Sequence, residues 1–276
     1  MAAGTSRLKR GLGGGRWDHF LTLTTALAGV EFKLRYFGSV LGYLWTFLRP
    51  LMLFGVLYVV FTEIVKFGGR VPHYPVVLLT GIVLFNFFGE ATSAGLSSLV
   101  DRENLLRKVS FPRAAIPVAV TLTAAANLAL GLLVVVLLAF IDGVDVRATW
   151  LLVPSMILTI FVFAMSISLL LSVLYVRFRD ARPIWEVVLQ LLFWGSPIIY
   201  TIQSVPEGFR ELVMCNPFAA ALQQIRHWFV DVSEPSAYEA IGGGALILIP
   251  IAIFVLVLLV SYWTFVRTAP HVAEDL

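Results

Sequence analysis

The sequence predicts an all-α membrane protein with six transmembrane helices, an N-terminal amphipathic interfacial helix, and short periplasmic helices between spans five and six. Two observations carry this prediction. Of the 276 residues, 59% are hydrophobic and 13% are charged, and the mean hydropathy of +0.90 excludes a water-soluble globule. The apolar residues also gather into stretches of about 20, which is the length of helix that crosses a hydrocarbon core.

Each predicted span is a long apolar stretch bounded by polar, Gly or Pro residues. Backbone groups in lipid must bond one another, so such stretches are expected to be helical. The predicted spans cover residues 42–64, 74–100, 114–141, 150–176, 183–203 and 242–266.

Orientation follows from the positive residues, because cytoplasmic loops collect Lys and Arg. With the N-terminus inside, 15 of the 20 Lys and Arg residues fall on the cytoplasmic side and 5 on the other. The sequence therefore predicts a multi-pass membrane protein with both termini cytoplasmic.

The segments outside the spans have their own signatures. Residues 1–15 contain a glycine run and predict a flexible cytoplasmic tail, and residues 267–276 predict a C-terminal one. Residues 16–41 begin like a signal peptide, but three threonines and a histidine weaken the apolar part, so we favour an amphipathic helix on the membrane surface. Residues 204–241 mix apolar runs with three prolines, which predicts short helices rather than a span; a merely amphipathic surface loop is the alternative.

The residues that would support an enzyme are missing from the sequence. No Gly-Lys-Ser/Thr motif for a phosphate-binding loop and no Gly-x-Ser-x-Gly elbow occurs, and the four histidines are scattered. Cys215 is the single cysteine, and only four residues are lysines, so neither a metal centre nor a nucleic-acid tail is expected. No cofactor is expected on this chain.

A few polar and aromatic residues inside the spans are candidates for a transport path. Glu90 is the only charge well inside a span; we favour a polar partner across a helix interface over a transport role. Aromatic rings can face lipid or stack on sugar rings. The candidate channel residues are Phe47, Phe85, Phe88, Glu90, Trp185, Trp194 and Tyr200.

The cytoplasmic loop 101–113 is predicted to hold a short charged helix that ends before Phe111-Pro112. Its Leu105-Leu106 pair is expected to be exposed, which favours contact with a partner over a simple positive anchor. The candidate coupling residues are Asp101, Arg102, Glu103, Asn104, Leu105, Leu106, Arg107 and Lys108.

Several motifs resemble ABC-2 type permeases of polysaccharide exporters, from about residue 30 to the end of the sixth span. The first group is Arg35-Tyr36, Ser39, Leu41-Gly42-Tyr43-Leu44-Trp45 and Pro50. The second is Asn104-Leu105-Leu106-Arg107-Lys108-Val109 with Phe111-Pro112-Arg113 and Pro117. The third is Arg179-Asp180, Ser196-Pro197, Tyr200, Pro206, Asn216-Pro217 and Arg226.

This resemblance implies that residues 42–266 form the transmembrane domain of an ATP-driven exporter in the bacterial inner membrane. Two copies would form a channel for a polyprenyl-linked polysaccharide, and two separate cytoplasmic subunits would bind ATP and Mg²⁺ and dock on loop 101–113. The cytoplasmic entrance would be framed by Arg35, Tyr36, Ser39, Tyr43 and Trp45. The periplasmic gate would include Ser196, Pro197, Asn216, Pro217 and Arg226.

The substrate class stays open between O-antigen, teichoic acid and cell-wall galactan. Lys is scarce relative to Arg, which is a feature of high-GC genomes and favours galactan. One alternative function is an ABC-2 permease for a small hydrophobic drug or lipid. The other is an integral membrane glycosyl- or acyltransferase, which would need a carboxylate or histidine pair near the membrane face.

Overall fold

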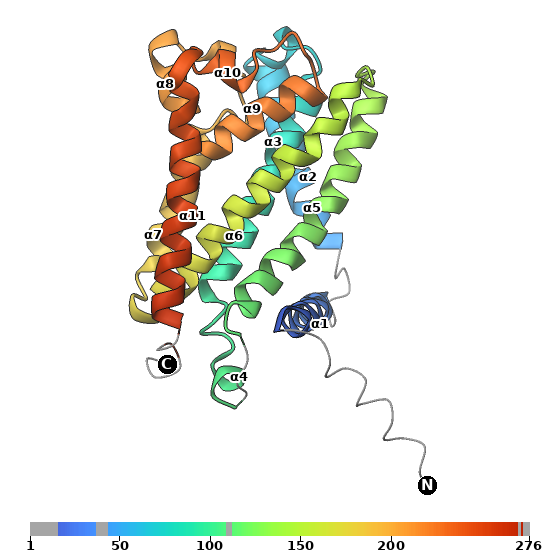
Figure 1. Ribbon diagram of the computed structural model, residues 1–276. Helices are drawn as coiled ribbons and strands as arrows, with labels where there is room; N and C mark the ends of the chain where they lie inside the picture. The colour runs from blue at the N-terminus through green and yellow to red at the C-terminus, as the bar shows by residue number, and fades with distance from the viewer. Residues whose placement is uncertain (1–15, 37–43, 109–111, 270–271, 273–276) are drawn as a thin grey trace.

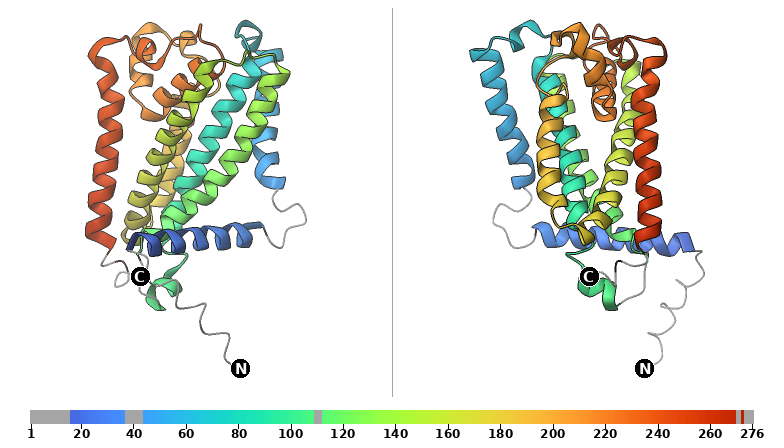
Figure 2. Two further views of the ribbon diagram at one scale, coloured as in Figure 1. Left: turned by 45° about the vertical axis from the view of Figure 1, so that its right-hand side comes forward. Right: turned by 90° about the vertical axis from the view of Figure 1, so that its left-hand side faces the viewer.

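The computed structural model describes residues 16–36, 44–108, 112–269 and 272, and the described residues form helices without a strand. The long helices run side by side as a bundle, with α1 lying crosswise beneath it (Figures 1 and 2). The helices are α1 Arg16–Tyr36, α2 Leu44–Val59, α3 Tyr74–Ser97, α4 Glu103–Lys108, α5 Ala115–Ile141, α6 Val153–Arg177, α7 Ala181–Gly195, α8 Glu207–Met214, α9 Pro217–Phe229, α10 Ala237–Ala240 and α11 Leu248–Thr268.

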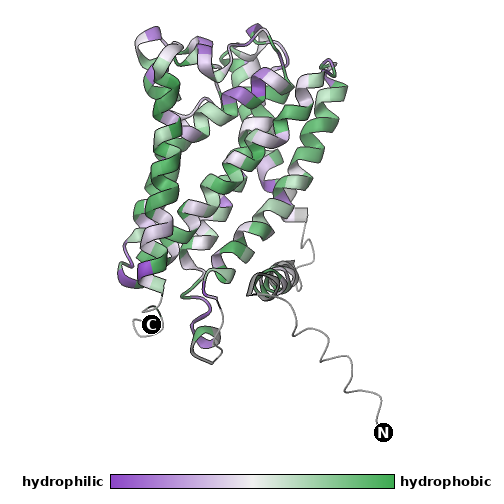
Figure 3. Ribbon diagram, viewed as in Figure 1, coloured by the Kyte–Doolittle hydropathy of each residue, from purple (hydrophilic) through white to green (hydrophobic). Residues whose placement is uncertain are grey.

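The bundle has two ends, which we name after helices found there. The α4 end holds α1, α4 and the last described residues, and the α9 end holds α8, α9 and α10 (Figure 1). The long helices between the two ends are mostly hydrophobic (Figure 3).

Four of the six predicted spans are helices long and apolar enough to cross a membrane, counted over the described part of the chain: Tyr74–Ser97, Ala115–Ile141, Ala148–Arg177 and Gly244–Thr268. The other two predicted spans are shorter α-helices. Helix α2 has 16 residues and passes into a π-helical turn at Val60–Ile64. Helix α7 has 15 residues and ends at Gly195, where the predicted span continued to residue 203. The backbone turns away after Gly195 because Pro197 has no amide hydrogen to continue the helix.

Helix α3 is the centre of the bundle and α11 is its outer surface. Within their most apolar windows, 78% of α3 is buried, compared with 11% of α11. Helix α3 packs on α6 where a Cβ on Gly95 would overlap the Ser168 hydroxyl, and on α5 where a Cβ on Gly131 would lie 2.7 Å from Val83. Small residues at these crossings let the helix backbones approach closely, as is typical of membrane helix pairs.

Helix α1 covers residues 16–36 of the predicted 16–41, and the remainder lies outside the described residues. It packs against α5: Thr24 is buried, and the Thr123 hydroxyl lies 3.5 Å from the Ala28 carbonyl oxygen, to which it donates. Polar and apolar residues are not strongly segregated to opposite sides of α1, so the structure does not confirm the predicted amphipathic character. Its crosswise placement at the α4 end is clear in both views of Figure 2.

Candidate functional site

A buried arginine holds the α9 end together. Arg226 on α9 is fully buried. Its Nη1 donates to the Tyr200 carbonyl at 3.1 Å, and its Nη2 donates to the carbonyls of Ile198 at 2.8 Å and Val77 at 3.3 Å. Because these acceptors belong to α3 and to the loop after α7, one side chain joins three separate segments.

The loop after α7 needs these donors because its backbone is irregular and buried. Residues 196–199 are all buried. Buried carbonyl groups without hydrogen-bond partners would destabilise the fold. The Tyr74 hydroxyl donates to the Ile199 carbonyl at 2.9 Å. On α3, a Cβ on Gly81 would lie 2.9 Å from the Ile198 carbonyl oxygen, so glycine is what allows this loop to approach α3 closely.

Asn216 joins the same loop to the start of α9. Its Oδ1 accepts a hydrogen bond from the Phe218 amide at 3.0 Å, which caps the helix before Pro217. Its Nδ2 donates to the Ser196 hydroxyl at 3.0 Å.

The five predicted gate residues, Ser196, Pro197, Asn216, Pro217 and Arg226, therefore lie at one junction, which we call the α7–α9 junction. The structure shows that they are packed together, while their role as a gate stays a prediction.

The charge of Arg226 is balanced from a segment that the sequence analysis did not single out. Glu234 is buried, and its Oε2 accepts from Gln223 Nε2 at 3.3 Å. Burial lowers the pKa of Arg226 to about 10, while Glu234 acts in the opposite direction, so the guanidinium is charged at neutral pH. No local pattern distinguishes Glu234 from the exposed acidic residues near it, because its burial depends on how the chain folds back after α9.

Three of the candidate channel aromatics are packed inside this chain. Phe88 is fully buried, with its ring centroid 5.7 Å from Phe163 and 5.3 Å from Phe218. Phe85 packs edge-on against Phe218 at 5.5 Å. Trp185 Nε1 donates to the Thr92 hydroxyl at 3.0 Å. Phe88 therefore does not line an open path in this structure, since α3 is surrounded by other helices, and the three rings stabilise the bundle.

Other predicted aromatics lie at the surface or outside the described side chains. Trp194 is 58% exposed and Trp45 is 51% exposed. The Tyr200 hydroxyl donates to the Trp194 carbonyl at 3.2 Å. The Phe47 side chain lies outside the described part. So do the Arg35 and Tyr36 side chains at the end of α1, and residues Ser39 and Tyr43.

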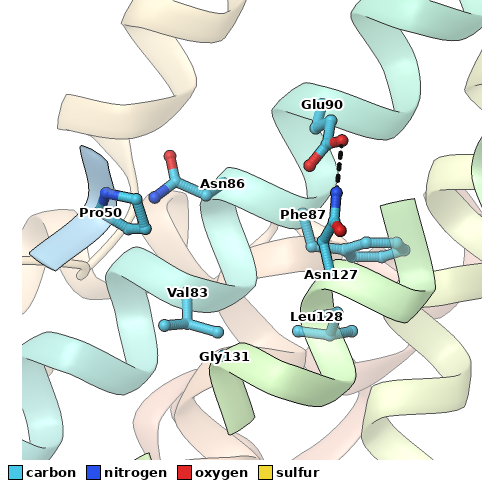
Figure 4. Close-up of a pocket in the computed structure, with 8 residues that line it drawn as sticks. All are labelled: Pro50, Val83, Asn86, Phe87, Glu90, Asn127, Leu128 and Gly131. Carbon is cyan, nitrogen blue, oxygen red and sulfur yellow. Dashed lines mark hydrogen bonds between the residues drawn. The ribbon is translucent and has the colours of Figure 1, made fainter. Parts of the chain in front are cut away.

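Glu90 has a polar partner on a neighbouring helix. Asn127 Nδ2 on α5 donates to Glu90 Oε1 on α3 at 2.9 Å (Figure 4). The pair borders a cavity of about 50 Å³, which is large enough for water. Pro50, Val83, Asn86, Phe87, Leu128 and Gly131 also line it. The predicted pairing across a helix interface is confirmed.

The predicted coupling helix is present as α4, but one of its leucines is not exposed. Leu106 is 8% exposed and packs with residues of α5, α6 and α11, including Ile116, Val173 and Phe265. The expected exposed pair is therefore wrong for Leu106, because α4 folds back against the α4 end of the bundle. Asn104 is exposed, and Asp101 accepts a hydrogen bond from the Ser97 hydroxyl at 2.6 Å. The side chains of Leu105, Arg107 and Lys108 lie outside the described part of the chain.

Known proteins resemble this chain over most of its length. It is 30% identical over 219 residues to the O-antigen export system permease protein RfbA of Myxococcus xanthus, which covers 78% of this chain and 83% of that protein. It is 26% identical over 214 residues to RfbA of Klebsiella pneumoniae, covering 77% and 82%. The sequence pattern described as "ABC-2 type transporter" matches residues 22–230. This chain belongs to the ABC-2 type transporter family.

Proposed function

We propose that this chain is the channel-forming permease subunit of an ATP-driven exporter. Its cargo would be a lipid-linked polysaccharide, moved from the cytoplasmic to the outer side of the inner membrane. The observation that carries the proposal is the similarity to two permeases named for O-antigen export, across more than three quarters of this chain. The family and these relatives are transporter membrane subunits rather than enzymes, so the transferase alternative is not retained.

The proposed topology has six spans, with α2 and its π-helical turn and α7 joining the four longer helices. The α4 end and both termini would be cytoplasmic. Exposed arginines at the α4 end support this orientation, because positive residues collect on the cytoplasmic side. They are Arg177, Arg179, Arg182 and Arg267. The crosswise α1 would lie at the cytoplasmic membrane surface.

The proposed energy source is a pair of separate ATP-binding subunits, since the sequence has no phosphate-binding loop of its own. They would hold ATP and Mg²⁺ and dock against α4, which lies beyond the ends of the long helices and packs on them through Leu106 (Figure 1). Two copies of this chain would be needed, one for each ATP-binding subunit, and the channel would form between them.

The test is to co-express the chain with its ATP-binding partner, purify the complex in detergent and measure the ratio of the subunits. We expect two copies of each. A chain that purifies alone as a stable monomer would contradict the proposal.

The substrate class is tested in proteoliposomes that contain this complex. A polyprenyl-linked O-antigen, teichoic acid or galactan is expected to stimulate ATP hydrolysis, and the three are compared in parallel. The matched control is the same polyprenyl carrier without its glycan. Stimulation by a hydrophobic dye, but by none of the glycolipids, would favour the small-molecule alternative.

A further inference from the structure

A second, larger pocket lies beside the α7–α9 junction, with which it shares Pro217. It has a volume of about 360 Å³, within the range of roughly 300–1,000 Å³ that ligand pockets occupy. Helices α6, α9, α10 and α11 form its walls. Its residues are Met156, Thr159, Pro217, Ala220, Ala221, Gln224, Ala237, Tyr238, Ile247, Pro250, Ile251 and Phe254.

The pocket exists because small and rigid residues meet at its centre. Ala220 and Ala221 on α9 face a region that α11 leaves open, and Pro250 begins α11 on the other side. Three consecutive glycines, 242–244, have φ values of +91°, +72° and +61°, which side-chain-bearing residues rarely adopt. This turn carries the chain from α10 to α11. It also brings the Gly244 amide to the Tyr238 hydroxyl, to which it donates at 2.9 Å, so the Tyr238 ring is fixed as a wall.

Two of the polar side chains around the pocket are hydrogen-bonded within the chain. The Thr159 hydroxyl donates to the Ser155 carbonyl at 3.0 Å. The Gln224 Oε1 accepts from the Ala237 amide at 3.0 Å. The surface offered to a ligand is therefore mainly apolar and carries no charge, and a pocket of this kind favours a hydrocarbon over water.

The pocket lies at the depth of one membrane leaflet. Met156 and Thr159 belong to the first two turns of α6, and Pro250 and Phe254 to the first two turns of α11. At 1.5 Å rise per residue, these side chains lie within roughly 10 Å of the first residues of α6 and α11. A lipid chain that enters from the surrounding leaflet would reach the pocket without crossing water.

The surface next to the pocket has the character of a lipid-facing surface. The exposed residues of α11 are large aliphatic and aromatic ones, including Ile251, Leu256, Leu259 and Trp263. Interfaces between membrane helices are instead enriched in small residues that let backbones approach closely. This difference favours a lipid over a second copy of the chain.

We propose that this pocket, bordered by Met156, Ala220 and Phe254, binds one acyl chain of a phospholipid in the leaflet at the α9 end. The acyl chain fills the space between α9 and α11 and holds α11 against the short helices. The proposal does not depend on which cargo the protein moves.

Photo-methionine tests the proposal in the full-length protein, because the five methionines include suitable controls. Met156 lines the pocket, Met52 is 58% exposed on α2, and Met214 is fully buried. The protein is reconstituted in phosphatidylethanolamine liposomes and irradiated either there or after extensive washing in detergent. Adducts are then mapped by mass spectrometry.

We expect phospholipid adducts at Met156 and Met52 in liposomes, and at Met156 alone after washing. Met214 should have none in either sample. If the Met156 and Met52 adducts were lost in parallel during washing, the proposal would be overturned. Lipid at Met156 would then be held no more tightly than lipid at the exposed Met52. Cross-linking of Met156 to a second copy of the chain would also overturn it.

Ala220→Phe fills the pocket and is expected to lower the Met156 adduct at least fivefold. Ala252→Phe makes the same change on an exposed part of α11 outside the pocket, and should leave the adduct unchanged. An equal adduct in both variants would contradict the assignment. Should Ala220→Phe fail to fold, the washing experiment on the unmodified sequence decides the question.

Discussion

Arg226 Nη2 donates a 2.8 Å hydrogen bond to the Ile198 carbonyl and thereby ties α9 to the loop that ends α7. The bond joins residues 28 positions apart, and the Arg226 side chain is fully buried. Removing the side chain would also leave the carbonyls of Val77 and Tyr200 without this donor. The α7–α9 junction is therefore expected to be sensitive to substitution of Arg226.

Arg226→Met should lower the free energy of unfolding by at least about 3 kcal/mol, since each buried acceptor left unpaired costs roughly 1–3 kcal/mol. The free energy of unfolding of Arg226→Lys should lie between those of Arg226→Met and the unmodified protein, because one ammonium group cannot reproduce the planar guanidinium fork. Thermal unfolding in detergent measures the effect. Arg147→Met, an exposed arginine at the same end, is the control and should have a nearly unchanged Tm.

Gly95→Ala should destabilise the crossing of α3 and α6, because the added methyl group overlaps the Ser168 hydroxyl. Overpacking of this kind costs typically 1–3 kcal/mol. Gly55→Ala on α2 is the matched control, since a Cβ there meets nothing within 4 Å. The two variants are compared by unfolding temperature, and equal temperatures would contradict the close approach of α3 and α6.

Phe88→Ala should lower stability by roughly 3–5 kcal/mol, as expected when a buried aromatic ring leaves a cavity. Trp194→Ala removes an exposed ring and should change the unfolding temperature little. Export by the reconstituted complex is measured alongside. A stable Phe88→Ala protein with impaired export would indicate that Phe88 takes part in transport.

Glu90→Gln should fold like the unmodified protein, because the glutamine carbonyl can accept the hydrogen bond from Asn127. Glu90→Leu removes the acceptor and should lower stability by about 1 kcal/mol or more. If Glu90 is structural, as we expect, Glu90→Gln keeps full export activity. Loss of export in a Glu90→Gln protein with a normal unfolding temperature would show that the charge itself is needed.

Leu106 and Asn104 on α4 should respond differently to substitution. Leu106→Asp places a charge in the apolar cluster with Phe265 and should destabilise the α4 end even without an ATP-binding partner. Asn104→Lys changes an exposed residue and should leave the Tm unchanged while weakening ATPase stimulation. ATP hydrolysis by the complex and unfolding of the isolated chain separate the two effects. Normal stimulation with Asn104→Lys would remove this residue from the proposed coupling surface.

Local features of the sequence predicted some contacts well. Prolines interrupt the apolar runs between residues 204 and 241, so the short helices there could be expected from the sequence. The end of α7 at Gly195 was not predicted, because the predicted span continued to residue 203. The pairing of Glu90 could also be expected, because a carboxylate inside an apolar bundle needs a polar partner. Which residue provides it, Asn127, depends on how α5 is rotated against α3.

The burial of Leu106, Phe88 and Glu234 could not be predicted in the same way. Leu106 follows charged residues in a loop, and Glu234 stands in a polar segment, so local sequence favours exposure for both. Their burial results from α4 folding against α5, α6 and α11, and from the chain after α9 returning toward Arg226. Contacts between distant segments of this kind leave no short-range pattern.

The sequence by itself determined the helical membrane class and the positions of four long spans. These depend on composition and on backbone groups that must be paired within lipid. Only the tertiary structure decided that α3 is enclosed and α11 is exposed, and that an acyl-sized pocket opens between α9 and α11. The physical reason is that a helix apolar on every side does not distinguish protein from lipid, since a hydrocarbon chain is as apolar as leucine.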